Sequence, residues 1–138
     1  KAFSGLLEVI TGDNGSVESV DNIGYKEENQ LKYTKRSFLS LGELPQPAWH
    51  LIRVENYIRK KFYANRVITI NTSRGCPYKC SFCCVPSIHM GKWRAVNAEV
   101  IIDNLFYLKN TYGIEGFQVD DDEFDIDRSR VLKLCDLL

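Results

Sequence analysis

The sequence predicts an α/β fold in which strands and helices alternate along the chain. Residues 66–72 contain the run Val67-Ile68-Thr69-Ile70, which is typical of a buried strand. A helical pattern follows from Ala98, and a second strand is predicted at residues 114–119. Strands joined by a helical crossover are parallel, and the crossover is right-handed. The pattern therefore predicts parallel strands with helical connections.

The first 36 residues show one helical pattern and two short strands. Apolar side chains recur at the i, i+3, i+4 and i+7 positions of one helix face: Phe3, Leu6, Leu7 and Ile10. Residues 17–25 and 31–33 are predicted strands around a polar turn. So short a segment cannot bury a core of its own. We interpret residues 1–36 as the tail of a preceding domain.

Residues 37–64 are interpreted as a linker to the domain formed by residues 65–138. Pro45 and Pro47 disfavour both helix and sheet in this segment. The apolar residues from Trp49 onward are expected to form a helix or two turns that pack against the next domain.

The first helix of residues 65–138 is predicted to begin near Ala98, with Asn97 as its cap. Gly113 is expected to end it. The predicted buried face consists of Ile101, Leu105, Leu108 and Tyr112.

The second helix is predicted to begin near Arg128, with Asp125 or Asp127 as its cap. Its apolar side consists of Val131, Leu134, Cys135 and Leu138. Cys135 is expected to lie in the core, since free cysteine is often buried.

Polar residues follow both predicted strands. Four cysteines lie between positions 76 and 84, and Asp120, Asp121 and Asp122 come directly after the second strand. In parallel sheets of this kind, ligands bind at the carboxyl ends of the strands. We therefore expect the cysteines and the aspartates to lie at the same end of the sheet.

The composition is that of an ordinary globular chain, 44% hydrophobic and 26% charged. A formal net charge of zero argues against nucleic acid as a partner. No apolar run approaches the roughly 20 residues of a membrane-spanning helix. Five cysteines without a secretion leader argue against a disulfide framework and predict a cytoplasmic protein with free thiols. The chain begins at Lys1 and ends within an apolar pattern, so we expect a fragment of a longer protein.

The cysteine loop, residues 74–84, reads Arg74-Gly75-Cys76-Pro77-Tyr78-Lys79-Cys80-Ser81-Phe82-Cys83-Cys84. Its spacing lets one short loop place the thiolates of Cys76, Cys80 and Cys83 around a compact inorganic core. Soft sulfur ligands favour an iron–sulfur cluster, zinc or copper(I). On a cubane cluster, three thiolates hold three irons and leave the fourth open to a substrate. Gly75 is expected to permit a turn or a close backbone approach.

The C-x3-C-x2-C spacing, with Phe82 before the last cysteine, resembles the signature of the radical S-adenosylmethionine (SAM) superfamily. Residues 72–83 are similar to the version found in its cobalamin-binding branch. Two further stretches resemble that branch, Leu44-Pro45-Gln46-Pro47-Ala48-Trp49 and Asp121-Asp122-Glu123-Phe124. The resemblance covers most of residues 38–138. It implies the first half of a partial (β/α) radical SAM barrel, preceded by the end of a cobalamin-binding-like domain.

The resemblance also implies a mechanism and its cofactors. A [4Fe–4S] cluster on Cys76, Cys80 and Cys83 would bind SAM and cleave it reductively to a 5′-deoxyadenosyl radical that abstracts a hydrogen atom. The electron would come from a donor such as flavodoxin or ferredoxin, and the substrate would be a small molecule. Cobalamin-dependent methylation or rearrangement is implied, with cobalamin bound mainly by a region before this chain.

The resemblance places three further residues at the cofactor. Phe82 would make a backbone contact near the adenine, or would shield the cluster from water. Asp121 or Asp122 would accept a hydrogen bond from the ammonium or the ribose of SAM, in place of the Gly-Gly-Glu motif common in this fold. The alternative for these aspartates is helix capping and solvation.

Two other functions remain open. A methylthiotransferase of the same superfamily shares the three-cysteine loop but has a different amino-terminal domain. A non-catalytic zinc or iron–sulfur module would need a fourth ligand for zinc, which Cys84, His89 or Cys135 could supply. No second C-x2-C pair is present. Cys84 is expected to point away from the three predicted ligands.

Overall fold

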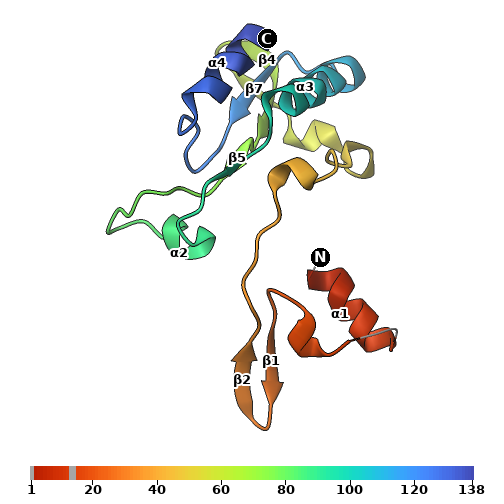
Figure 1. The fold of residues 1–138 in the computed structure, drawn as a ribbon. Coiled ribbons are helices and arrows are strands. Elements are labelled where there is room, and N and C mark those ends of the chain that lie inside the picture. The colour runs from red at the N-terminus through yellow and green to blue at the C-terminus, as the bar shows by residue number, and fades with distance from the viewer. Residues whose placement is uncertain (1, 13–14) are drawn as a thin grey trace. The chain divides into compact units, whose positions relative to one another are not determined.

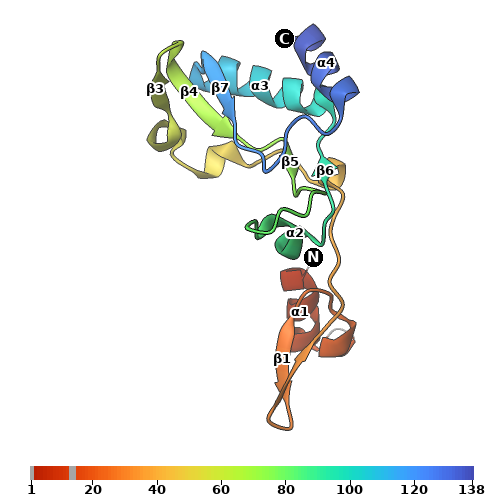
Figure 2. The same ribbon diagram turned by 90° about the vertical axis from the view of Figure 1, so that its left-hand side faces the viewer.

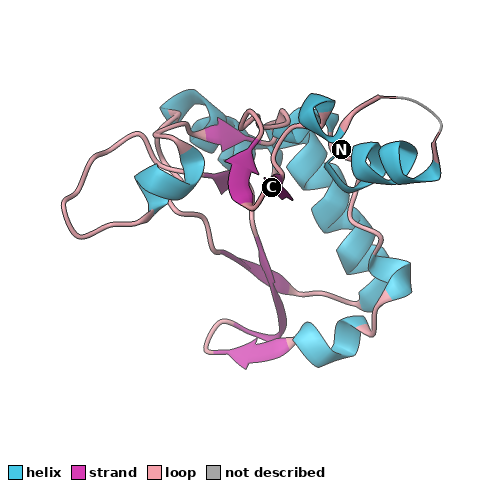
Figure 3. Ribbon diagram, turned by 90° about the horizontal axis from the view of Figure 1, so that it is seen from below, coloured by secondary structure: helices cyan, strands magenta, loops and turns pink. Residues whose placement is uncertain are grey.

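The computed structural model describes residues 2–12 and 15–138. It divides into two compact units, Lys1–Leu39 and Ser40–Leu138. Figure 3 shows that long loop segments connect the helices and strands. No helix in the described residues combines the length and the apolar character that a bilayer crossing requires. The interpretation of residues 1–36 as a domain tail and of 37–64 as a linker stays a prediction.

The first unit contains a helix and a hairpin (Figure 1). Helix α1 spans Ala2–Thr11, and β1 (Gly24–Glu27) pairs antiparallel with β2 (Gln30–Tyr33). Glu28 and Asn29 form the connecting turn with φ values of 44° and 67°, as a two-residue hairpin turn requires. The helix predicted around Phe3 to Ile10 and the strand predicted at residues 31–33 are both confirmed.

The predicted strand at residues 17–25 is wrong in its first half. Val17–Ser19 forms a 3₁₀ turn, and β1 begins only at Gly24. The hydroxyl of Ser19 donates to the carbonyl of Ser16 at 2.7 Å. Local bonds of this kind compete with strand pairing, and Val20 is buried directly after the turn.

The second unit is built on a three-stranded sheet in the order β3-β4-β7. β4 (Ala64–Ile70) and β7 (Gly116–Val119) are parallel, and their register runs from Val67 opposite Gly116 to Ile70 opposite Val119. The predicted parallel pair is thus confirmed. β3 (Arg59–Lys61) adds an antiparallel edge. It was not predicted, because its three residues are all charged and show no apolar alternation.

Two helices complete this unit. α3 (Ala98–Tyr112) connects β4 to β7 and runs along both strands in Figures 1 and 2, and α4 (Arg128–Leu137) packs against α3. The core lies between the helices and the sheet. Its buried apolar members are Val54, Ile68, Ile70, Ala98, Ile101, Ile102, Leu105, Leu108, Ile114 and Leu134. The expected packing of the segment after Trp49 is confirmed, because its 3₁₀ turns (Trp49–Leu51 and Val54–Tyr57) place Val54 in this core.

The helix ends follow the sequence signals with one exception. Gly113, with φ of 63°, ends α3 and donates its N–H to the carbonyl of Lys109 at 3.0 Å. Asp127 caps α4, because its Oδ1 accepts from the N–H of Arg130 at 3.1 Å. Asn97 occupies the cap position of α3, but its side chain makes no capping bond.

The expected burial of Cys135 is wrong. The buried residues of α4 are Arg130 and Leu134, which lie one turn apart on the same side of the helix. Cys135 follows Leu134 and is therefore turned by about 100° from that side. Its side chain is exposed.

A short two-stranded stem closes the chain segment that contains the cysteines. β5 (Ser73–Arg74) pairs antiparallel with β6 (Arg94–Ala95), and α2 (Val85–His89) lies between them along the chain. Gly75 leaves β5 with φ of 87°. A Cβ atom at this position would clash with the carbonyl oxygen of Lys92 and would lie 2.9 Å from Cβ of His89. The predicted need for glycine is confirmed, and its cause is the chain that returns toward β6.

Gly75→Ala is predicted to displace the base of the cysteine loop and to lower the free energy of unfolding. The added methyl group meets a backbone carbonyl, which cannot move without opening the stem. Gly91→Ala is the matched control, because Gly91 also has a positive φ, of 64°, but its Cβ would meet nothing within 4 Å. Urea unfolding should show a larger loss of unfolding free energy for Gly75→Ala than for Gly91→Ala. Equal losses would contradict the close approach of Gly75 to the carbonyl of Lys92.

Leu108→Ala is predicted to destabilise the second unit by about 2–5 kcal/mol, the usual result of emptying a core leucine site. Leu108 is 0% exposed at the centre of the helix–sheet core. Leu132→Ala removes the same atoms from a side chain that is 52% exposed, and should change stability by less than about 0.5 kcal/mol. Chemical denaturation measures both values, and a loss below about 1 kcal/mol at Leu108 would show that this core is not packed as described.

Candidate functional site

The two polar segments meet at the carboxyl end of the sheet. The N–H of Asp120 donates to the carbonyl of Ile70 at 2.9 Å, which extends the parallel ladder by one bond. The side-chain amide of Asn71 donates to the carbonyl of Asp120. The expectation that cysteines and aspartates follow the same end of the sheet is therefore confirmed.

Asp121 fastens the chain after β4 to the chain after β7. Its Oδ1 accepts from the N–H of Thr72 at 2.6 Å, and its Oδ2 accepts from the hydroxyls of Thr72 at 2.6 Å and Ser73 at 2.7 Å. Thr72 and Ser73 are 2% and 1% exposed. A carboxylate that accepts from buried groups satisfies donors that would otherwise be stranded. Asp121 therefore holds the base of the cysteine loop in place.

Arg130 reaches the same place from α4. One terminal nitrogen donates to the carbonyl of Thr72 at 3.0 Å and to its hydroxyl at 2.6 Å. Nε donates to the carbonyl of Val96 at 3.0 Å, and the other terminal nitrogen donates to that of Phe124 at 3.4 Å. The guanidinium lies 5.8 Å from the ring centre of Trp93 and 5.4 Å from that of Phe124, within the range of cation–π attraction.

Charge and burial act on Arg130 in opposite directions. Burial lowers the pKa of its guanidinium, and the negative charges of Asp121 and Asp127 raise that pKa. An arginine keeps its proton in proteins, so a cation is held inside at 7% exposure. The hydroxyl of Thr72 accepts from Arg130 and donates to Asp121. The three groups thus form one continuous polar chain from cation to anion.

Asp122 fixes the loop one step further on. Its Oδ2 accepts from the N–H of Gly75 at 2.7 Å and lies 3.7 Å from Nε2 of His89. Nδ1 of His89 is 3.2 Å from a terminal nitrogen of Arg94. The indole N–H of Trp93 donates to the carbonyl of Glu123 at 2.8 Å. The segment after β7 therefore contacts the residues next to both strands of the stem, at its loop end.

In the acidic segment after β7, the carboxyl groups of Glu123 and Asp125 interact with each other. The pKa of Glu123 is raised, chiefly by a hydrogen bond with Asp125, with burial and the charge of Asp125 adding to the effect. This pair lies beyond the two aspartates that hold the loop.

The three predicted metal ligands lie on one loop beyond this anchored base. Cys76 and Cys83 are half-buried, Cys80 is exposed, and all are free thiols. The N–H of Cys83 donates to the carbonyl of Cys80 at 3.1 Å and forms a turn between them. In residues 2–12 and 15–138, no three Cys, His, Asp or Glu side chains lie close enough together to hold a metal ion. The donor chemistry fits an iron–sulfur cluster, and the ligand assignment stays a prediction.

The neighbouring residues of the loop are also accessible. Phe82 is 91% exposed, so its side chain covers neither a thiol nor any other part of the protein. Cys84 is exposed, and its carbonyl accepts from the N–H groups of Ser87 and Ile88 at the start of α2. The predicted contact of Phe82 with adenine stays a prediction.

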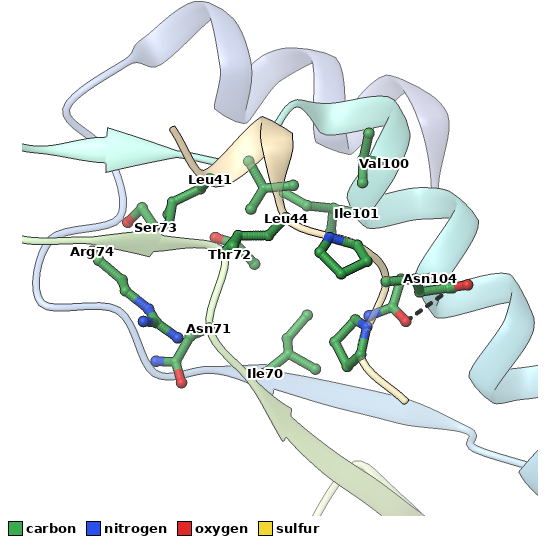
Figure 4. A pocket seen from close by; sticks show the side chains of 14 residues that line it. Leu41, Leu44, Ile70, Asn71, Thr72, Ser73, Arg74, Val100, Ile101 and Asn104 are labelled. Atoms are coloured by element: carbon green, nitrogen blue, oxygen red, sulfur yellow. Dashed lines mark hydrogen bonds between the residues drawn. The ribbon is translucent and has the colours of Figure 1, made fainter. Parts of the chain in front are cut away.

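A cavity of about 150 Å³ lies beside the stem (Figure 4). Leu41, Leu44, Ile70, Thr72 and Ile101 line it, together with the prolines of the Leu44–Trp49 segment. Asn104 of α3 fixes this segment, because its Oδ1 accepts from Gln46 at 3.2 Å and from the indole of Trp49 at 2.9 Å. The Leu-Pro-Gln-Pro-Ala-Trp stretch is therefore docked on α3.

Sequence reasoning missed Arg130, Thr72 and Ser73. A signal for Arg130 was present, because it lies four residues before Leu134 on the buried side of α4. A cation in the first turn of a helix is unfavourable to the helix dipole. Such a residue on an apolar stripe indicates partners supplied by the rest of the fold.

No family model matches the chain. A cytidylyl-2-hydroxyethylphosphonate methyltransferase from Streptomyces wedmorensis is 34% identical over 100 residues, which cover 67% of this chain and 19% of that protein. An uncharacterized methyltransferase from Pyrococcus horikoshii is 29% identical over 96% of this chain and 28% of its own length. An anaerobic magnesium-protoporphyrin IX monomethyl ester cyclase from Cereibacter sphaeroides is 31% identical over 65% of this chain and 14% of its own length. The chain thus spans less than a third of each of these relatives.

The fold has a solved counterpart. The cobalamin-dependent SAM radical enzyme OxsB, with aqua-cobalamin and SAM bound, matches 99% of this chain and 19% of its own chain with a TM-score of 0.71 at 20% identity. The α/β architecture matches a segment of that enzyme. The cysteine spacing and the methyltransferase and cyclase relatives place this chain in the radical SAM superfamily, within the group related to its cobalamin-dependent members.

Proposed function

We propose that this chain forms the cluster-binding part of a radical SAM enzyme that acts on a small-molecule substrate. The observation that carries the proposal is the anchoring of a three-cysteine loop at the carboxyl end of a parallel sheet. Asp121 and Asp122 accept from the residues just before Cys76, so the loop begins from a fixed point. Ligands of parallel α/β folds bind at this end.

Cys76, Cys80 and Cys83 are proposed to hold a [4Fe–4S] cluster. Such a cluster, with one iron free of protein ligands, supplies the one-electron reductive cleavage of bound SAM. All three thiols are free, and none is fully buried, so they can converge on a cluster without opening the core. Turn geometry brings Cys83 back toward Cys80. Cys84 and Cys135 are left outside the ligand set.

Asp122 is favoured over Asp121 as the group that accepts from the SAM ammonium or ribose. Both oxygens of Asp121 already accept from Thr72 and Ser73. One oxygen of Asp122 accepts from the N–H of Gly75, and the Asp122 side chain is 31% exposed. Its other oxygen has lone pairs available for a ligand. The backbone of Phe82 is proposed to contact the adenine.

The methyltransferase names of two relatives and the cobalamin dependence of OxsB support a proposal about the type of reaction. We place methyl transfer first and rearrangement second among the reactions of the whole protein, with cobalamin bound mainly by an N-terminal region of that protein. A flavodoxin or ferredoxin is proposed as the electron donor. The methylthiotransferase alternative gains no support from the proteins compared.

Anaerobic reconstitution with iron and sulfide is predicted to load about four irons per chain. Alanine variants at positions 76, 80 and 83 should each lose most of that iron, because the two remaining thiolates cannot hold a cubane cluster that needs three. Cys84→Ala and Cys135→Ala are the matched controls and should load like the parent chain. Iron and sulfide analysis with electron paramagnetic resonance (EPR) spectra measures both sets.

Addition of SAM should change the EPR spectrum of the reduced cluster, because the open iron gains ligands. A chain that retains zinc and takes up no iron would support the metal-binding module instead. If the five cysteine variants bound equal amounts of iron, the assignment of Cys76, Cys80 and Cys83 as the ligands would be wrong.

A further inference from the structure

We propose that Arg130 is a positioning residue for the cysteine loop, an inference that rests on the proposed function. It acts through Thr72, whose carbonyl and hydroxyl both accept from the guanidinium. Thr72 in turn donates twice to Asp121. A group on α4 thereby sets the position and direction from which the chain enters the loop.

Three segments that are distant in sequence meet at this guanidinium. The carbonyls of Thr72 after β4, Val96 after β6 and Phe124 after β7 all accept from it. The N–H of Val96 also donates to the carbonyl of Thr72 at 2.9 Å. Arg130 therefore fixes both strands of the stem relative to the segment that carries Asp121 and Asp122.

The planar shape of the guanidinium is essential to this role. Its donors point in fixed directions within one plane, whereas a lysine ammonium is a compact charge with three rotatable donors. Lysine at position 130 can keep the charge opposite Asp121 but cannot reach the three carbonyls together. The rings of Trp93 and Phe124, 5.8 Å and 5.4 Å from the guanidinium carbon, favour the same planar cation.

The geometry also separates positioning from the general stability of the fold. Arg130 contacts the stem, whereas Leu108 and Ile68 form the centre of the core. Loss of the guanidinium should therefore loosen the stem and the base of the loop before the sheet and α3. Amide hydrogen exchange resolves such local opening.

The first test is hydrogen exchange of the apoprotein with Arg130→Met and its control Arg128→Met. Arg128 lies on the same helix with an exposed side chain. Exchange of the Thr72, Gly75 and Val96 amides should rise at least tenfold in Arg130→Met and stay unchanged in Arg128→Met. Amides in the centre of α3 should keep their protection. A rise shared by α3 would assign Arg130 to global stability and overturn the proposal, as would unchanged stem amides.

The second test uses the reconstituted chain. Arg130→Met should still load iron, but at least tenfold more SAM should be needed to change the EPR spectrum, and Arg130→Lys should recover part of this loss. Thr72→Val removes only the hydroxyl between Arg130 and Asp121, and covers the case in which Arg130→Met does not fold. It should weaken the response to SAM in the same direction.

The outcomes separate the two proposals. If the parent chain loads a cluster that responds to SAM, and both variants respond at the same SAM concentration, the positioning role is wrong and the proposed function stands. If the parent chain loads no iron, the proposed function fails and the positioning role fails with it.

Discussion

At the carboxyl end of the sheet, a guanidinium, a hydroxyl and a carboxylate lie in sequence inside the protein. Arg130 donates to Thr72, and Thr72 donates to Asp121. Burying a cation is costly unless it is paired and hydrogen-bonded, and this arrangement supplies both conditions. Loss of any member would strand the others away from water. The start of the cysteine loop depends on this polar chain, because Thr72 belongs to it, Ser73 is bound to Asp121 and Gly75 is bound to the neighbouring Asp122.

The structure combines a rigid base with an open cysteine loop. Thr72, Ser73 and Gly75 are buried and bonded to the aspartates, whereas Cys80 and Phe82 are exposed. Under the proposed function, the three thiols would converge only when the cluster binds. Metal binding and local folding are coupled in such sites. The protein therefore sets where the loop begins, and the proposed cluster would draw the cysteines together.

Periodic patterns explain which elements could be predicted from the sequence. β4, β7 and α3 carry runs long enough to show strand or helix spacing. α2 has five residues, and β5 and β6 have two each, which is too short for any periodicity. Their positions are fixed by contacts between distant residues, such as the bond from Gly75 to Asp122. The candidate ligands were visible as a spacing of like residues. The place of Arg130 on the buried side of α4 indicated buried partners, but the sequence could not identify them, because most are main-chain carbonyls.

Three consecutive aspartates follow β7, and the fold gives each a different task. Asp120 continues the strand pairing through its backbone, with its N–H bonded to Ile70. Asp121 points into the protein and holds Thr72 and Ser73. Asp122 turns to the other side, where it meets Gly75 and His89. Because the chain bends at Asp122, neighbouring carboxylates of one acidic run reach different partners at the base of the loop. One short acidic segment thereby holds the base of the loop at two points, and under the proposed function Asp122 would also meet the cationic group of SAM.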